Sequence, residues 1–220
     1  MLTKEQVFEI MGKYYGNAHW RWDYSEHDLR LTTEVLDKVN SLGYHFSNLN
    51  KLHNTEDVRF VPIILEYYDK FECKTYSNWF LQSICFRSYS EYIPNLVAIY
   101  EQTDDLDLKN AVSQCFLQMR CKKYIPEYLR IVNDPNYGEN FDWTMDVLCK
   151  LRVKEAIPKL LELVNRYPQK WTWTFIWGAP FFKDPSLIPY LEPFLDHPDG
   201  EFRSMARKGI SKLNDIKSKN

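Results

Sequence analysis

Glycine is scarce in this chain, and long apolar runs and an excess of one charge are missing. The 7 glycines among 220 residues indicate a mostly helical protein, because few of its turns require glycine's backbone freedom. No run of about 18 apolar residues occurs, so we expect no membrane-spanning helix. The charged stretch MLTKEQVFEIMGKYY at the N-terminus lacks the apolar core of a secretion signal. We therefore expect a cytoplasmic protein.

Paired cysteines are also missing. The five cysteines are odd in number and include no CxxC pair, so the sequence predicts neither a disulfide framework nor a zinc site. Cys85, Cys115 and Cys149 fall in apolar stretches with helical spacing, which predicts free thiols packed in the core. Free thiols are typical of a reducing compartment.

Motifs for catalysis, metals and cofactors are missing as well. No histidine has the spacing of a metal-ligand pair, and neither a glycine-rich phosphate loop nor a nucleophile elbow occurs. We therefore expect no metal, no cofactor and no catalytic residue. The histidines are His19, His27, His45, His53 and His197.

Charge is nearly balanced along the chain. It carries 28 basic and 30 acidic side chains, for a formal net charge of −2. Residues 157–220 are the most basic part, with 10 basic and 7 acidic side chains. A protein that neutralises many phosphates normally has a much stronger basic surface, so the charge argues against a nucleic-acid partner.

One phrase, an aliphatic residue followed by proline, recurs at a fixed period. Examples are SEYIPNLVAIYEQ, KKYIPEYLRIVND and KEAIPKLLELVNR. Successive prolines of this phrase lie 32, 32, 32 and 31 residues apart, and they are Pro62, Pro94, Pro126, Pro158 and Pro189. A period in this range is typical of stacked repeats. Proline suits the first helical turn, where its missing N–H is not needed, so each proline predicts the start of a helix.

The residues after each proline predict one buried face. Counted from the residue before proline, positions 0, 3, 6 and 7 are apolar or aromatic in every repeat, which is helical spacing. Position 3, for example, reads Ile64, Leu96, Tyr128, Leu160 and Leu191. A polar turn and a second apolar helix follow in each repeat. Such hairpins bury both faces only when neighbours stack.

These patterns predict an all-α fold, a single α-solenoid domain over residues 1–220. We expect an N-terminal helical cap over 1–55, about five hairpins of period 32 over 56–214, and a short polar tail over 215–220. The cap is predicted to begin with a capping box between Thr3 and Gln6. Its helices are predicted to stop at Gly16 and Gly43, and HWRWDY, residues 19–24, is predicted to lie extended on them.

The last repeat resembles a known family. DPSLIPYLEPFLDHPDGEFRSMARKGISKLND, residues 184–215, contains Ile-Pro at one helix start, then a turn with Asp and Pro, and then an acidic-apolar-Arg step at the start of the next helix. The matching residues of the turn and helix start are Asp196, Pro198, Glu201, Phe202, Arg203 and Ala206. This order of residues resembles the short HEAT-like repeats named after phycobilisome lyases. The resemblance covers residues 56–214. The resemblance implies an α-solenoid that binds another protein. The family also includes small DNA glycosylases and bilin-handling lyase subunits.

The resemblance implies that the Ile-Pro helices line the concave face of the stack, where a partner would bind. The candidate residues on this face are Asn95, Glu127, Arg130, Lys159, Glu162 and Tyr190. Because packed helices lie about 8–10 Å apart, we expect Glu127 to meet Lys159 and Arg130 to meet Glu162. Such a self-neutralising square is a poor groove for a polyanion. The alternative is a solvated ladder that only sets the stacking register.

The aromatic stretch WTWTFIWGAPFF, residues 171–182, is a second candidate site. Pro180 removes a backbone hydrogen bond, which predicts a kink or a helix end near Gly178. One interpretation is an aromatic cleft for a ligand, a partner or a flipped base, formed by Trp171, Trp173 and Trp177. The other is packing in the core, where aromatic rings bury the most area.

The sequence therefore predicts a monomeric, non-enzymatic protein-binding module, such as a bacterial inhibitor of the immunity type or an adaptor. The partner is expected to be another protein, with no role for a membrane. The alternative is a DNA glycosylase or another nucleic-acid-binding enzyme. That activity needs a basic groove, aromatic rings that stack on bases, and an acidic catalytic residue.

Overall fold

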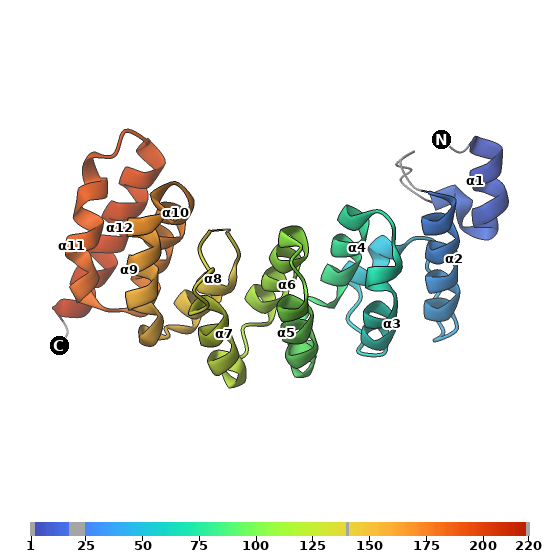
Figure 1. Ribbon diagram of the computed structural model, residues 1–220, viewed down its shortest axis with the longest axis horizontal. Coiled ribbons are helices and arrows are strands. Elements are labelled where there is room, and N and C mark those ends of the chain that lie inside the picture. The colour runs from blue at the N-terminus through green and yellow to red at the C-terminus, as the bar shows by residue number, and fades with distance from the viewer. Residues whose placement is uncertain (1–2, 18–24, 140, 219–220) are drawn as a thin grey trace. The chain divides into compact units, whose positions relative to one another are not determined.

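A computed structural model describes residues 3–17, 25–139 and 141–218 of the chain, and these residues form helices and turns without a strand (Figure 1). The all-α prediction is confirmed. The chain divides into two compact units, Met1–Met119 and Arg120–Asn220. This division falls inside the predicted repeats and not near residue 55. Each unit is described by itself, and a continuous solenoid through both stays a prediction.

The first unit begins with the two helices of the predicted cap. Its α-helices are α1 (Lys4–Met11), α2 (Glu26–Asn40), α3 (Phe60–Tyr67), α4 (Lys74–Leu81), α5 (Ile93–Gln102) and α6 (Leu106–Met119). The capping box at α1 is confirmed, since the Gln6 N–H donates to the Thr3 hydroxyl and the Thr3 N–H donates to the Gln6 side chain. The α-helix ends before the predicted stop at Gly16. α1 ends at Met11, Gly12 follows with φ of +49°, and the chain continues as the 3-10 helix η1 (Gly12–Asn17).

The predicted cap also includes α2 and the segment that precedes it. α2 ends at Asn40, and Gly43 follows in the turn with φ of +99°, a conformation that favours glycine. The prediction of a stop at Gly43 is therefore correct to within the length of one turn. The predicted extended segment, residues 19–24, lies outside the described residues.

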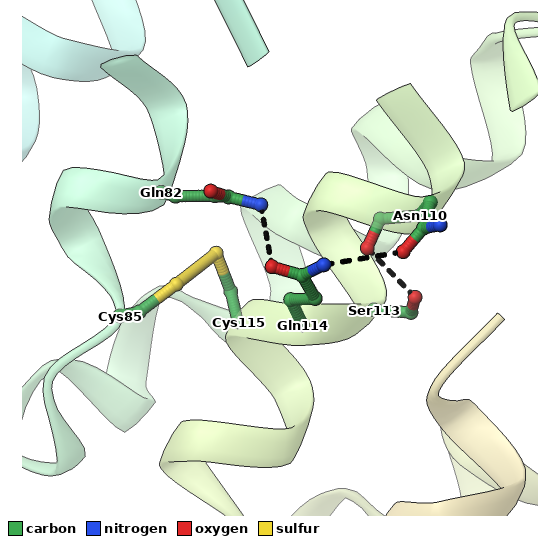
Figure 2. The surroundings of a disulfide bond; sticks show 6 residues. All are labelled: Gln82, Cys85, Asn110, Ser113, Gln114 and Cys115. Carbon is green, nitrogen blue, oxygen red and sulfur yellow. Dashed lines mark hydrogen bonds between the residues drawn. A yellow bond between two sulfur atoms is a disulfide. The ribbon is translucent and has the colours of Figure 1, made fainter. Parts of the chain in front are cut away.

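Cys85 and Cys115 are joined by a disulfide bond, so the prediction that both are free core thiols is wrong (Figure 2). Cys85 follows the 3-10 turn η4 (Gln82–Ile84) after α4, and Cys115 lies on α6. Packing of α4 against α6 brings the two Cα atoms to 4.6 Å, within the usual range for a disulfide. The free cysteines are Cys73, Cys121 and Cys149. The cysteines therefore no longer support the expected reducing compartment.

The second unit consists of three successive helical hairpins. Its α-helices are α7 (Ile125–Val132), α8 (Thr144–Leu151), α9 (Ile157–Arg166), α10 (Pro168–Gly178), α11 (Ile188–Leu191) and α12 (Gly200–Lys217). Helix α7 packs on α8, α9 on α10 and α11 on α12, while α10 also contacts both α8 and α12 (Figure 1). The second helices of the hairpins therefore form a row, α8–α10–α12, in this unit.

The repeated prolines lie at the helix starts that the sequence predicts. Pro94, Pro126, Pro158 and Pro189 occupy the first turn of α5, α7, α9 and α11, and Pro62 is the third residue of α3. At position 3 of the repeat, every side chain is at most 1% exposed. Burial is therefore confirmed at position 3, whereas positions 0, 6 and 7 also include half-buried residues, such as Ile125, Ile99 and Val164.

Candidate functional site

Five of the six predicted partner-binding residues lie on the proline-started helices of the second unit. Glu127 and Arg130 are on α7, Lys159 and Glu162 on α9, and Tyr190 on α11. Arg130 and Glu162 are exposed, and 50% of the surface of Tyr190 is exposed. Asn95, the sixth residue, is exposed at the start of α5 in the first unit.

Lys159 does not pair with Glu127 on the neighbouring helix as predicted. The Lys159 ammonium lies 3.2 Å from the Glu162 carboxylate, one turn away on the same helix. The Lys159 side chain is 11% exposed, so it is held largely inside the surface. Glu127 Oε2 is buried and has no hydrogen-bond partner among the described residues. The predicted Glu127–Lys159 ion pair is therefore wrong, and the Lys159–Glu162 pair stabilises α9 by about 0.2–0.5 kcal/mol.

The predicted break in the aromatic stretch is confirmed. Helix α10 ends at Gly178, and the chain continues as the 3-10 turn η8 (Ala179–Phe182), which contains Pro180. A proline at this point cannot donate the backbone hydrogen bond that an α-helix needs. The last aromatic residues of the stretch, Phe181 and Phe182, therefore lie in the 3-10 turn and not in α10.

The three tryptophans of the stretch have different environments. Trp171 is fully buried, and its indole N–H donates to the Gly138 carbonyl oxygen over 3.0 Å, so Trp171 belongs to the core. Trp173 is 42% exposed, and its ring lies 5.8 Å from that of Phe202. Trp177 is half-buried and lines a groove. The cleft interpretation therefore fits Trp177 and the adjoining Trp173, and the core interpretation fits Trp171.

The groove lies between the end of α10 and the middle of α12. Its volume is about 210 Å³, and it is lined by Ile176, Trp177, Pro180, Phe181, Met205, Lys208, Gly209 and Lys212. The rings of Trp177 and Phe181 have their centroids 4.9 Å apart. The ammonium of Lys150, on α8, lies 5.0 Å from the centre of the Trp177 ring, at a distance typical of a cation–π contact. The groove thus combines aromatic walls with lysine side chains.

Gly209 explains how α12 comes so close to the end of α10. A Cβ atom at this position would lie 2.9 Å from Pro180 Cγ and 3.4 Å from Leu191 Cδ1. A glycine inside an exposed helix destabilises it by about 1 kcal/mol relative to alanine. Here the missing side chain allows Pro180 to rest on α12, which fixes the floor of the groove.

A group of buried polar side chains near α8 was not predicted from the sequence. Asp142 accepts hydrogen bonds from the Tyr137 hydroxyl and from the Thr144 N–H, over 2.7 and 2.8 Å. Asp146 is 3% exposed, and its Oδ1 has no hydrogen-bond partner among the described residues. Burial raises the pKa of Asp146 to about 7, repulsion by Asp142 acts in the same direction, and Lys150 opposes it.

Asp146 has a pKa suited to proton transfer near neutral pH, but its carboxyl group is closed to solvent. A general acid or base must come within hydrogen-bond distance of its substrate. The groove is lined by neither Asp146 nor Asp142. The described lining of the groove therefore contains no acidic side chain of the kind that a glycosylase requires.

The histidines have structural surroundings where they are described. The ring of His53 lies tilted against that of Trp79 with 4.3 Å between ring centres, and burial lowers the pKa of His53 to about 4. His197 accepts from the Asp199 N–H in the turn before α12. Among the described residues, no group of His, Cys, Asp or Glu side chains has the arrangement of a metal site. The described helices also include none with the length and apolarity to span a membrane.

Over its described residues the protein is thus an all-helical chain of hairpins, with an aromatic groove between the second helices of the last two hairpins. No protein-family model, curated protein or solved structure matches this chain.

Proposed function

We propose that this protein is a non-enzymatic binding module whose proline-started helices form a concave surface for a protein partner. One observation carries the proposal. The five repeats keep an apolar or aromatic residue at position 3 and change the chemistry of position 2, which reads Ile63, Asn95, Glu127, Lys159 and Tyr190. Repeat proteins use such positions for recognition, because stacking constrains the core and leaves the outer side chains free to vary.

The exposure of some of these side chains supports the proposal, since Asn95 and Tyr190 are exposed, whereas the Lys159 side chain is only 11% exposed. In α7 the exposed Arg130 lies between the buried Tyr128 and Ile131 in the sequence. In α11 the buried Leu191 follows the exposed Tyr190. Tyrosine and arginine are enriched at the centres of protein interfaces. One helix per hairpin thus offers a polar and aromatic surface without using the residues that hold the hairpin together.

Affinity capture from an extract of cells that produce the protein tests this function. The bait carries Glu162→Lys and Tyr190→Ala, and the matched control carries Glu155→Lys, which makes the same charge change in the exposed turn before α9. We expect one protein to bind the wild type and the control. Its affinity for the double variant should be at least about tenfold lower, or about 1.4 kcal/mol, at an unchanged melting temperature.

Two results would overturn this function. One is a partner that binds the double variant and the wild type equally. The other is the absence of any captured protein together with turnover of a small molecule or release of a base from DNA. The glycosylase alternative also requires that the protein shifts DNA at about 50 mM salt, where non-specific binding is strongest.

A further inference from the structure

The groove between α10 and α12 offers a surface on the second helices of the hairpins, and not on the first helices, which carry the repeated prolines. We propose that it binds a short acidic segment of a partner protein. A large apolar side chain of that segment enters between Trp177 and Phe181, and neighbouring carboxylates pair with Lys208 and Lys212. The inference rests on the proposed function, since the segment belongs to a protein partner, and it adds a second contact of stated chemistry.

The size of the groove fits a side chain better than a free small molecule. Ligand pockets usually have volumes of about 300–1,000 Å³, and this groove has about 210 Å³. Its walls are apolar or aromatic, including Trp177, Phe181 and Met205. A groove of this size and lining fits one large apolar side chain, which is how an anchor residue of a peptide is bound.

The aromatic surface continues beyond the groove along the same two helices. Trp173 lies one turn before Trp177 on α10, and Phe202 lies one turn before Met205 on α12. The Trp173 and Phe202 rings contact each other, and Trp173 is exposed. From Phe202 to Lys212 the helix rises about 15 Å, which is the length of four or five residues of extended chain. A short extended segment therefore matches the seam.

The charge around the groove selects an acidic segment. Lys208 and Lys212 are exposed one turn apart on α12, and neither forms an ion pair with a described residue. Lys150 adds a third cation over the Trp177 ring. Helix α12 as a whole carries five basic and two acidic side chains. The balanced charge of the rest of the chain favours a short acidic peptide over a nucleic acid, which requires a longer basic surface.

A peptide-display selection tests the inference with the full chain. The probe is a library of random 12-residue peptides, and the selected peptides are synthesised with a fluorescent label for anisotropy measurements. We expect peptides in which Leu, Ile or Phe is flanked by Asp or Glu. Their affinity should fall at least tenfold for the Lys208→Glu, Lys212→Glu variant. The matched control is Lys122→Glu, Lys123→Glu, which changes two exposed lysines, of which Lys123 lies over the ring of Tyr124, and should change affinity less than twofold.

Charge exchange and a second surface variant make the test decisive. Replacing the peptide's acidic residues by lysine should restore binding to the Lys208→Glu, Lys212→Glu variant, a result that an unfolded variant cannot give. Binding should persist in the Glu162→Lys, Tyr190→Ala variant, so the groove and the proline-started helices are tested separately. Selected peptides without acidic residues, or peptides unaffected by the lysine changes, would overturn the inference. So would lysine-dependent binding of a dT12 oligonucleotide or of phosphatidylglycerol vesicles when no acidic peptide is selected.

Discussion

The Gln82 side chain donates a 2.7 Å hydrogen bond to the side chain of Gln114, its counterpart 32 residues later (Figure 2). Gln114 Nε2 in turn donates to the Asn110 side chain over 3.4 Å, on the same face of α6. The contact lies next to the Cys85–Cys115 disulfide in Figure 2. Neighbouring repeats of the first unit are thus joined by a polar contact and a covalent one.

The Gln82–Gln114 contact reveals a second period, on the second helix of each hairpin. Continuing at the same spacing of 32 from Gln82 and Gln114, the sequence reads Asp146 and then Gly178. One turn earlier, the corresponding residues are Asn78, Asn110, Asp142 and Thr174. Polar residues recur at these positions except at Gly178, and Asn78, Asp142, Asp146 and Thr174 are buried. The Gln82–Gln114 pair favours one stacking register, because a shift would separate the two side chains.

Gln114→Ala tests the polar contact. A half-buried amide–amide hydrogen bond contributes about 1 kcal/mol to the free energy of unfolding, and we expect a loss of that size in urea denaturation. Gln118→Ala, at an exposed position of the same helix, is the control and should change stability by less than about 0.5 kcal/mol. If the effects of Gln82→Ala and Gln114→Ala are additive in the double variant, the two side chains do not interact.

Reduction of the Cys85–Cys115 disulfide should destabilise the first unit. The bond spans 30 residues, and closing a loop of this length stabilises a protein by about 3–4 kcal/mol in the chain-entropy model. We expect dithiothreitol to lower the denaturation midpoint of the wild type and of Cys121→Ser, and to leave Cys115→Ser unchanged. Alkylation of unreduced, denatured protein should label Cys73, Cys121 and Cys149. Labelling of all five cysteines would contradict the bond.

The sequence predicts those features that depend on local pattern. The starts of the proline-started helices, the burial of position 3 and the helix end at Gly178 all follow from proline geometry and helical spacing. The disulfide did not follow, because Cys85 and Cys115 meet only when α4 packs on α6. The pairing of Glu127 with Lys159 was wrong, because Lys159 has a nearer partner on its own helix in Glu162.

The groove was predicted only in part, because it depends on how two helices pack against each other. Helical spacing and Pro180 indicated a cleft in the aromatic stretch, and Trp177 lines one. The lysines of α12 were not predicted to line the groove, because the sequence does not show how closely two helices approach. Gly209 was the available signal, as a glycine inside a helix that has to lie close to a neighbour.

The stability of the wild type should fall as the pH rises from about 4 to 7, and Asp146→Asn should abolish this fall. The pKa of Asp146 is raised from 3.8 to about 7 in the folded protein, so between these values the unfolded chain releases a proton that the folded chain retains. Stability conferred by the neutral carboxyl group is complete below pH 4 and is lost as pH rises to 7. A shift of about three units corresponds to an upper limit of about 4 kcal/mol.

The measurement compares wild type with Asp146→Asn in urea at pH 5, 6, 7 and 8. The free energy of unfolding of the variant minus that of the wild type should increase as the pH rises and should level off above pH 7. The difference cancels the opposite contribution of His53, whose lowered pKa removes stability when pH falls below about 6.5. Stability curves that stay parallel from pH 5 to 8 would show that Asp146 is already ionised in the folded protein.

Gly178→Ala should destabilise the second unit through a single contact with Cys149. A Cβ atom at position 178 would lie 2.6 Å from Cys149 Sγ and 3.3 Å from its Cβ, and both residues are buried. Alanine is otherwise favoured over glycine in a helix by up to about 1 kcal/mol. The overpacking between α8 and α10 should outweigh this gain and lower the free energy of unfolding by about 1–3 kcal/mol.

Cys149→Ala in combination with Gly178→Ala identifies the cause. Removal of Sγ opens space for the new methyl group, so the double variant should be more stable than the sum of the two single changes predicts, by about 0.5–3 kcal/mol. Gly200→Ala is the matched control, since a Cβ there meets only the end of the Arg203 side chain, at 3.4 Å, and we expect equal or greater stability. Because Gly178 follows Trp177, the single variant should also change tryptophan fluorescence, as α10 moves away from Lys150 on α8. Strict additivity of the two changes would show that Gly178 is required for a reason other than its contact with Cys149.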